Sequence, residues 1–156
     1  MRQSILALLV TTLVALPGCA RATGADAFAE LPAGVAWVAN PAVPGVQIAV
    51  VAGRPQDAGP YALRVRFPPG VRVMPHTHPE DRIYTILRGA WFIGLGETFD
   101  STRLERHPAG AVYVVRAGVA HFHLARDGET IFQITATGPT ATTFVNPGVN
   151  PRGAPR

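Results

Sequence analysis

The feature that most constrains the fold is a glycine-bounded segment, residues 70–89, with two closely spaced histidines near its middle. Its sequence is Gly-Val-Arg-Val-Met-Pro-His-Thr-His-Pro-Glu-Asp-Arg-Ile-Tyr-Thr-Ile-Leu-Arg-Gly. Successive side chains of an extended strand point to opposite faces, so His76 and His78 lie on the same face, about 6–7 Å apart along the strand. Two imidazoles at this spacing can bind one metal ion, and a third ligand is needed to complete the site.

A second apolar segment, residues 110–121, also runs through a glycine turn into a histidine, His121. Together the two segments resemble the two sequence motifs of the cupin family. The residues that match are Gly70, His76, His78 and Gly89 in the first motif and Gly110, Gly118 and His121 in the second. Arg116 and Ala125 stand where the second motif usually has proline and asparagine, and these changes affect only the turn and neighbouring hydrogen bonds.

The resemblance implies an all-β single domain, the double-stranded β-helix or cupin-like jelly-roll barrel, with one divalent transition metal ion bound by His76, His78 and His121. Imidazole nitrogens suit zinc, iron, nickel, copper or manganese, and the ligand types do not choose among these metals. Because metal ligation requires neutral imidazole, we expect affinity to fall as the histidines protonate near pH 6. Members of the family commonly pair through the outer sheet and N-terminal arm, so the resemblance also implies a homodimer.

The main departure from the pattern is Arg82, which stands where the family usually has a metal-binding glutamate. Three interpretations remain open. Arg82 points into the barrel and binds the carboxylate or another anion of a small substrate; it pairs with Glu80, Asp81 or Glu97 at the surface; or it occupies the metal position and leaves the barrel metal-free. With Arg82 in place of the glutamate, we expect weaker metal binding, unless Glu80 or Asp81 swings in to restore a carboxylate.

Further side chains are candidates for contacting a substrate or supporting the metal ligands. His123 shares a strand face with His121 and is expected to look into the same cavity. Tyr84 and Tyr113 can supply hydrogen bonds or stacking, with core packing as the alternative for each. His107, which precedes a proline, is interpreted as a loop residue.

Residues 1–22 are predicted to be an export signal, with a short cationic head followed by an apolar run, Ile5 to Leu16, that is too short to span a bilayer. Two interpretations of its end compete. Leu16-Pro-Gly-Cys19 resembles a bacterial lipobox, in which Cys19 would be lipid-modified, whereas Ala20-Arg21-Ala22 fits ordinary cleavage. The protein is therefore expected to be exported, either free in the periplasm or anchored to the cell envelope by lipid.

Composition limits the remaining classes. The chain has 156 residues, of which 47% are hydrophobic and 15% charged, which is enough for one domain with a packed core. All 14 basic residues are arginines, scattered singly, and the net charge is only +4, so no nucleic-acid partner is expected. No phosphate-binding or dinucleotide loop is present, so no nucleotide cofactor is implied. We expect an N-terminal arm over 23–45, the barrel over 46–145 and a loose tail over 146–156.

The barrel segment contains short runs rich in β-branched and aromatic residues, bounded by glycine, proline or aspartate. The predicted strands are Val46–Val51, Tyr61–Phe67, Val71–Met74, Ile83–Leu87, Ala90–Leu95, Ala111–Val115, Ala120–Ala125 and Thr130–Thr137. Asp127-Gly128 predicts a hairpin between the last two of these strands, and Gly89 predicts another turn that returns the chain across the strand before it.

Two functions are open on this basis. The first is a metal-dependent enzyme acting on a small oxygenated or carboxylated compound, of the dioxygenase, isomerase or lyase kind that the resemblance implies. The second is a non-catalytic module that binds a small ligand or a metal at the cell envelope, because one fold hosts both kinds of protein. A general acid or base positioned in the cavity would favour the enzyme.

Overall fold

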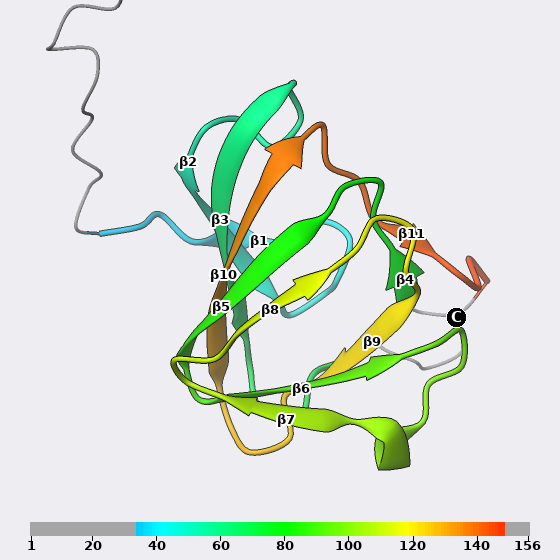
Figure 1. Ribbon diagram of the computed structural model, residues 1–156. Coiled ribbons are helices and arrows are strands. Elements are labelled where there is room, and N and C mark those ends of the chain that lie inside the picture. The colour runs from blue at the N-terminus through cyan, green and yellow to red at the C-terminus, as the bar shows by residue number, and fades with distance from the viewer. Residues whose placement is uncertain (1–33, 149–156) are drawn as a thin grey trace, which may run out of the picture. The chain divides into compact units, whose positions relative to one another are not determined.

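The computed structural model describes residues 34–148, which form an almost entirely β barrel (Figure 1). Its elements are β1 (Val38–Ala39), β2 (Gln47–Ala52), β3 (Gly59–Phe67), β4 (Arg72–Thr77), β5 (Arg82–Arg88), β6 (Ala90–Leu95), η1 (Ser101–Arg103), β7 (Glu105–Pro108), β8 (Val112–Val115), β9 (His121–Leu124), β10 (Thr130–Gly138) and β11 (Thr143–Phe144). The predicted export signal and most of the predicted tail lie outside the described residues. Within residues 34–148 there is no helix long and apolar enough to span a membrane.

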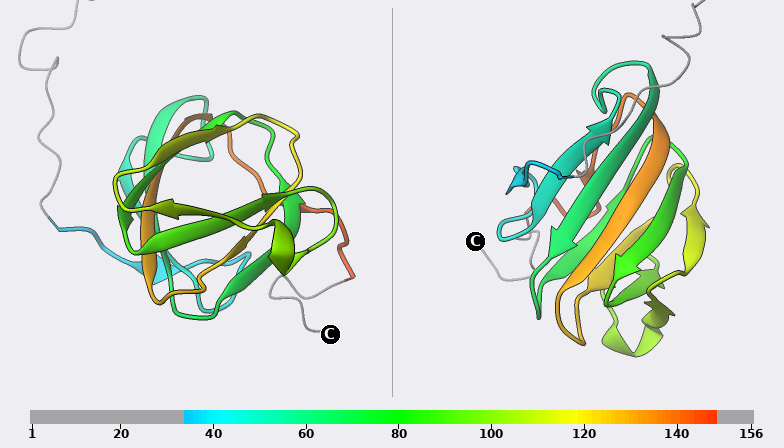
Figure 2. Two further views of the ribbon diagram at one scale, coloured as in Figure 1. Left: turned by 60° about the horizontal axis from the view of Figure 1, so that its bottom comes forward. Right: turned by 90° about the vertical axis from the view of Figure 1, so that its left-hand side faces the viewer.

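The strands form two antiparallel sheets. One has the order β1-β2-β3-β10-β5-β8 and the other β11-β4-β9-β6-β7. The views in Figure 2 show the sheets facing each other around a common interior. Such a pair of facing sheets is the double-stranded β-helix, so the predicted fold class is confirmed.

Both predicted hairpins are wrong. β9 pairs with β4 and β6 in one sheet, whereas β10 pairs with β3 and β5 in the other, so Asp127-Gly128 joins strands of different sheets. Gly89 likewise carries the chain from β5 in one sheet to β6 in the other. Gly89 has a φ of +74°, and a Cβ there would collide with the Glu129 carbonyl oxygen. The glycine signals a tight corner, but it does not tell whether the two strands stay in one sheet.

Three short strands were not predicted, and one of them changes the interpretation of His107. β7 has the polar sequence Glu-Arg-His-Pro, which lacks strand-forming side chains, and it forms because it pairs with β6. His107 is therefore a strand residue opposite Trp91, and its ring stacks on Tyr113 with centroids 4.7 Å apart. The loop assignment of His107 is wrong.

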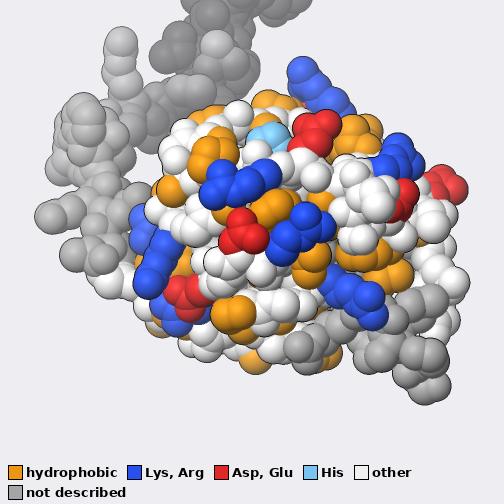
Figure 3. Space-filling view, turned by 90° about the horizontal axis from the view of Figure 1, so that it is seen from below, with side chains coloured by type: hydrophobic (Ala, Val, Ile, Leu, Met, Phe, Trp, Pro, Cys, Tyr) orange, Lys and Arg blue, Asp and Glu red, His pale blue; other side chains and the backbone are white. Residues whose placement is uncertain are grey.

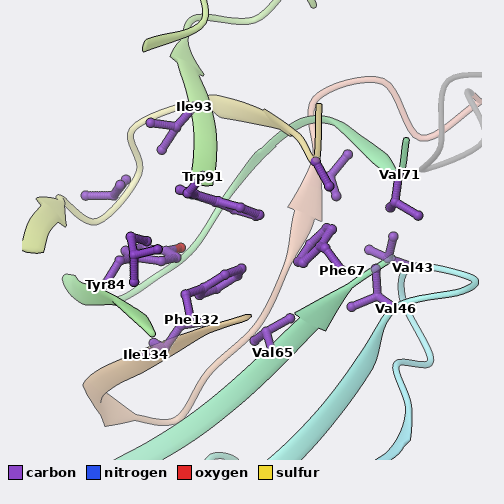
Figure 4. Close-up of a cluster of buried hydrophobic side chains, with 14 of the residues drawn as sticks. Val43, Val46, Val65, Phe67, Val71, Tyr84, Trp91, Ile93, Phe132 and Ile134 are labelled. Atoms are coloured by element: carbon purple, nitrogen blue, oxygen red, sulfur yellow. The ribbon is translucent and has the colours of Figure 1, made fainter. Parts of the chain in front are cut away.

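The interior between the sheets is filled by valines and aromatic rings (Figure 4). Trp91 is completely buried, and its ring centroid lies 4.2 Å from that of Phe132 and 4.8 Å from that of Phe67. Val43 and Val46, which precede β2, pack against the same cluster. Val73 of β4 belongs to this cluster, so the same packing holds the strand that carries His76.

The outer surface is mixed in character. On the face in Figure 3, arginine and acidic side chains alternate with apolar ones, and no continuous stripe of one charge appears on that face. Several arginines are paired with neighbouring acids, as in the contacts of Arg54 with Asp57 and of Arg116 with Asp81.

Candidate metal centre

Strand pairing brings the two histidine motifs together. β4 and β9 are neighbours, and His76 lies directly opposite His121. The backbone nitrogen of Gly118 donates to the carbonyl oxygen of His78 at 2.8 Å, which ties the turn of the second motif to the first. Gly118 itself has a φ of +73°, the left-handed region that favours glycine.

A β-bulge aims His76 into the barrel. Val73 pairs with His123 and His76 with His121, so Met74 and Pro75 together oppose Phe122 alone. Without the extra residue, regular alternation would place His76 on the face opposite to Val73. With it, both line the cavity. Pro75 suits this position because proline has no N–H to donate to the ladder.

The three predicted ligands form one cluster. One imidazole nitrogen from each of His76, His78 and His121 lies within 4.8 Å of those of the other two, and all three side chains are buried. The ring centroids of His76 and His121 are 4.4 Å apart. A donor set of this size and spacing fits one divalent transition ion.

Each of these rings is held by a backbone carbonyl. Nδ1 of His76 donates to Met74, Nδ1 of His78 to Ala141 and Nδ1 of His121 to Val119, at 2.8, 2.8 and 2.9 Å. A carbonyl oxygen only accepts, so Nδ1 carries the proton in all three neutral rings and Nε2 carries the lone pair. Nε2 of His121 is buried without a hydrogen-bond partner. This arrangement is the one that orients histidines as metal ligands.

Burial also keeps these rings neutral. Desolvation, with smaller contributions from Arg82 and the neighbouring imidazoles, lowers the pKa of His76 to about 3 and that of His78 to about 2. Desolvation likewise lowers the pKa of His121 to about 4. The expectation that these histidines protonate near pH 6 is therefore wrong for the folded protein, because it used the pKa of a solvated imidazole.

Arg82 is buried next to this cluster and makes three hydrogen bonds. Its Nε donates to Oε1 of Glu80 at 2.7 Å, its Nη2 to Oγ1 of Thr140, and its Nη1 to Nε2 of His78 at 2.8 Å. Burial by itself would lower the pKa of the guanidinium. The phenols of Tyr84 and Tyr61, together with Glu80, outweigh burial and raise the pKa of Arg82 above its ordinary value, so the side chain stays charged.

The position of Arg82 excludes one of the three interpretations, that of an ion pair at the surface. Arg82 points inward and lines the cavity, and it pairs with Glu80 inside the protein and not at the surface. Neither nearby carboxylate joins the histidine cluster. Asp81 is exposed and pairs with Arg116 and with the backbone nitrogen of Ala117. Arg82 therefore stands where the sequence motif usually has glutamate, and its Nη1 donates to Nε2 of His78, a predicted metal ligand.

His76, His78 and Arg82 line a cavity of about 300 Å³, whereas His121, which is fully buried, is not among its lining residues. Most of its wall is apolar, and its rim includes residues 40–43 and 140–142. The apolar lining residues include Ile48, Leu63, Val65, Phe67, Phe132 and Ile134. Cavities of this kind, with apolar walls and a few convergent polar groups, are typical of small-molecule sites.

The other predicted site residues divide into two groups. His123 and Tyr84 line the cavity, and the His123 ring packs on Trp91 with centroids 4.4 Å apart, outside the three-nitrogen cluster. Tyr113 is not among the residues lining this cavity. It stacks in parallel on Tyr84, 5.0 Å between centroids, and lines a separate hollow that also includes His107.

Tyr61 and Thr140 belong to the site but were not found from the sequence. Both donate a hydroxyl hydrogen bond to Oε1 of Glu80, the atom that also accepts from Arg82. Thr140 follows the last long strand in a Gly-Pro-Thr segment, where nothing in the sequence marks it. Tyr61 is fifteen positions before the first histidine and looks like a core residue. Its role appears only in the folded sheet, where β10 lies between β3 and β5.

Comparisons with known proteins agree on the fold. No protein-family profile matches the chain, and no curated protein matches it significantly. Several solved structures are similar to the chain. KdgF from a Halomonas species has 24% sequence identity, covering 65% of this chain and 84% of that one, with a TM-score of 0.52. The polyketide cyclase RemF from Streptomyces resistomycificus has 17% identity, coverage of 76% and 84%, and a TM-score of 0.63.

A cupin 2 conserved barrel domain protein from Leptotrichia buccalis is also similar, with 16% identity, coverage of 60% of this chain and 41% of that one, and a TM-score of 0.50. At these identities the likeness shows the fold alone. The chain has the cupin barrel fold, as its two motifs predicted.

Proposed function

We propose that the chain is a metal-dependent cupin that binds a small carboxylated or oxygenated molecule at His76, His78 and His121. The observation that carries the proposal is the shared tautomer: each ring gives its Nδ1 hydrogen to a carbonyl and keeps Nε2 as a lone-pair donor. Bound there, a divalent ion would act as a Lewis acid toward an oxygen of the ligand.

Other residues of the chain would bind and orient the ligand. Arg82 supplies a fixed positive charge at the cavity wall, suited to a carboxylate of the ligand. The apolar walls, with Phe67 and Phe132 among them, would hold the body of the ligand and exclude water. Reactions of the dioxygenase, isomerase or lyase kind are consistent with these parts, and the polyketide cyclase RemF is one enzyme on the same fold.

A non-catalytic binding or sensing module is the alternative, and one observation favours it. No carboxylate is among the described residues that line the cavity, and Oε1 of Glu80 already accepts three hydrogen bonds. A reaction that needs a carboxylate as general base is therefore poorly supported. Elemental analysis of protein purified from its native envelope would narrow the list of reactions, because each metal permits only some of them.

Calorimetric titration with Zn(II), Fe(II), Ni(II), Cu(II) and Mn(II) tests the metal proposal. We expect one ion per chain, with affinity at least about tenfold weaker in His76→Ala and in His121→Ala. His107→Ala is the matched control, since His107 lies outside the cluster on β7. If both cluster variants bind metal as the parent does, the centre is wrong, and the cavity should be reassigned as a metal-free anion pocket around Arg82.

We also propose export, with Cys19 as a lipid anchor or with cleavage after Ala22. Incorporation of labelled palmitate, abolished by Cys19→Ser, would support the anchor, and the mass of the mature N-terminus would identify ordinary cleavage.

A homodimer is proposed from the family resemblance. The exposure of Val112 and Val114 on β8, at 61% and 48%, is consistent with an outer-sheet contact, and light scattering during size exclusion tests it.

A further inference from the structure

The hydrogen bond from Arg82 to His78 links metal binding to the occupant of the cavity. Nε2 of His78 has one lone pair, because Nδ1 of the same ring donates to Ala141. Nη1 of Arg82 already uses that lone pair at 2.8 Å. A metal ion and Arg82 therefore compete for the same atom, and three histidines become available together only when Nη1 finds another acceptor.

In the protein interior, Nη1 of Arg82 leaves Nε2 of His78 only when a stronger hydrogen-bond acceptor replaces that nitrogen. The Arg82 side chain is only 8% exposed and stays charged, so removing one acceptor without a replacement would leave a donor unsatisfied. Its other bonds need not change: Nε remains on Glu80, which is itself fixed by Tyr61 and Thr140. The exchange is a change of acceptor at one nitrogen and does not move the charge out of the site.

A carboxylate is the acceptor that fits. It matches a guanidinium in charge and geometry, and a charge-assisted pair of this kind is stronger than a bond to a neutral imidazole. Arg82 borders the cavity, whose walls are mostly apolar, and no carboxylate is among the described residues that line it. The incoming molecule must therefore bring the negative charge, and its body must be apolar.

We propose that a small carboxylate with an apolar body draws Nη1 of Arg82 away from His78, so that the carboxylate and the metal bind cooperatively. The inference rests on the proposed three-histidine centre and adds a ligand class and a coupling to it. Without the carboxylate, two of the three histidines of the proposed centre, His76 and His121, have an Nε2 lone pair that Arg82 does not use, and the metal binds weakly. With it, the third ligand is released, and by linkage the metal strengthens carboxylate binding by the same factor.

The test is titration of the full-length protein with Co(II), followed by visible absorption and calorimetry at controlled free Co(II). The added probes are acetate, butyrate and benzoate, and acetamide, butyramide and benzamide serve as neutral controls of the same shape. Arg82→Gln removes the guanidinium and with it the Nη1 donor to His78. Because that change leaves Glu80 buried without its ion pair, E80Q/R82Q is the second variant, and Arg116→Gln is the matched control at an exposed, ion-paired arginine.

In the parent we expect at least one carboxylate to tighten Co(II) binding about tenfold or more, and Co(II) to tighten that carboxylate equally. The amides should have no effect. Arg82→Gln or the double variant should bind Co(II) more tightly than the parent without any carboxylate, and should gain nothing from one. Arg116→Gln should behave as the parent.

Three negative results have different meanings. If the parent binds Co(II) with the same affinity whether or not a carboxylate is present, the coupling is wrong and the three-histidine centre stands. If neither the parent nor an Arg82 variant binds Co(II), the proposed centre is wrong and the coupling is lost with it. A carboxylate effect that persists in both Arg82 variants would also overturn the inference, because it would not pass through Arg82.

Discussion

The ion pair between Glu80 and Arg82 should be strongly coupled energetically, because both partners are withdrawn from water. Their side chains are each 8% exposed, and Nε lies 2.7 Å from Oε1. Removing one partner from a buried pair leaves an uncompensated charge and costs about 3–5 kcal/mol. Oε2 of Glu80 is buried and has no hydrogen-bond partner, so Arg82→Gln would leave that carboxylate poorly compensated.

A double-mutant cycle measures this coupling. The free energy of unfolding in urea is compared for the parent, Glu80→Gln, Arg82→Gln and E80Q/R82Q. Each single change should destabilise the barrel by about 3 kcal/mol or more, and the double change should cost well below the sum of the two. The coupling energy is then about 3 kcal/mol.

The pair of Arg116 and Asp81 is the matched control for the cycle. Its Nη1–Oδ2 distance is also 2.7 Å, but its side chains are 74% and 50% exposed. Water screens such a pair, so its coupling should be much the smaller of the two. Equal couplings in the two cycles would refute the reasoning, since they would mean that Glu80 and Arg82 are solvated in solution.

Two further predictions concern stability. Burial lowers the pKa values of His76, His78 and His121 to about 3, 2 and 4, so the unfolded chain takes up protons before the folded chain as the pH falls below about 6.5. Each histidine should then lower the free energy of unfolding by up to about 1.4 kcal/mol per pH unit. Constant urea midpoints between pH 7.5 and 5.5 would contradict this. Gly94→Ala should cost about 1–3 kcal/mol, because the new methyl would collide with the buried ring of Phe122, and a urea midpoint equal to that of the parent would show that the ring moves aside freely.

Much of the architecture could be predicted because each motif places its histidines at a fixed spacing from glycines, and the side chains of a strand alternate between its two faces. Alternation placed His76 and His78 on one face, and the spacing of the second motif brought in His121. The sheet assignment could not be predicted, because Gly89 and Gly128 specify tight corners and not which sheet receives the next strand. The bulge was equally hidden, since Pro75 is compatible with either a strand edge or a bulge.

The site was predicted less completely than the fold. Arg82 was identified by its departure from the motif, but its bond to His78 depends on a side-chain direction that spacing alone does not give. The pKa values failed for a similar reason, because the reference value for histidine describes a solvated ring and these rings are buried. Thr140 lies 58 residues from Arg82 in the sequence, and only the folded chain brings them together.

The most direct test of the central claim is anomalous diffraction from crystals of the Co(II)-loaded protein with a bound carboxylate. We predict one anomalous peak per chain, at about 2.0–2.1 Å from Nε2 of His76, His78 and His121, with Arg82 no longer donating to His78. An absence of any peak among these three nitrogens would contradict the claim. So would a peak held by His76 and His121 while Arg82 remains hydrogen-bonded to His78.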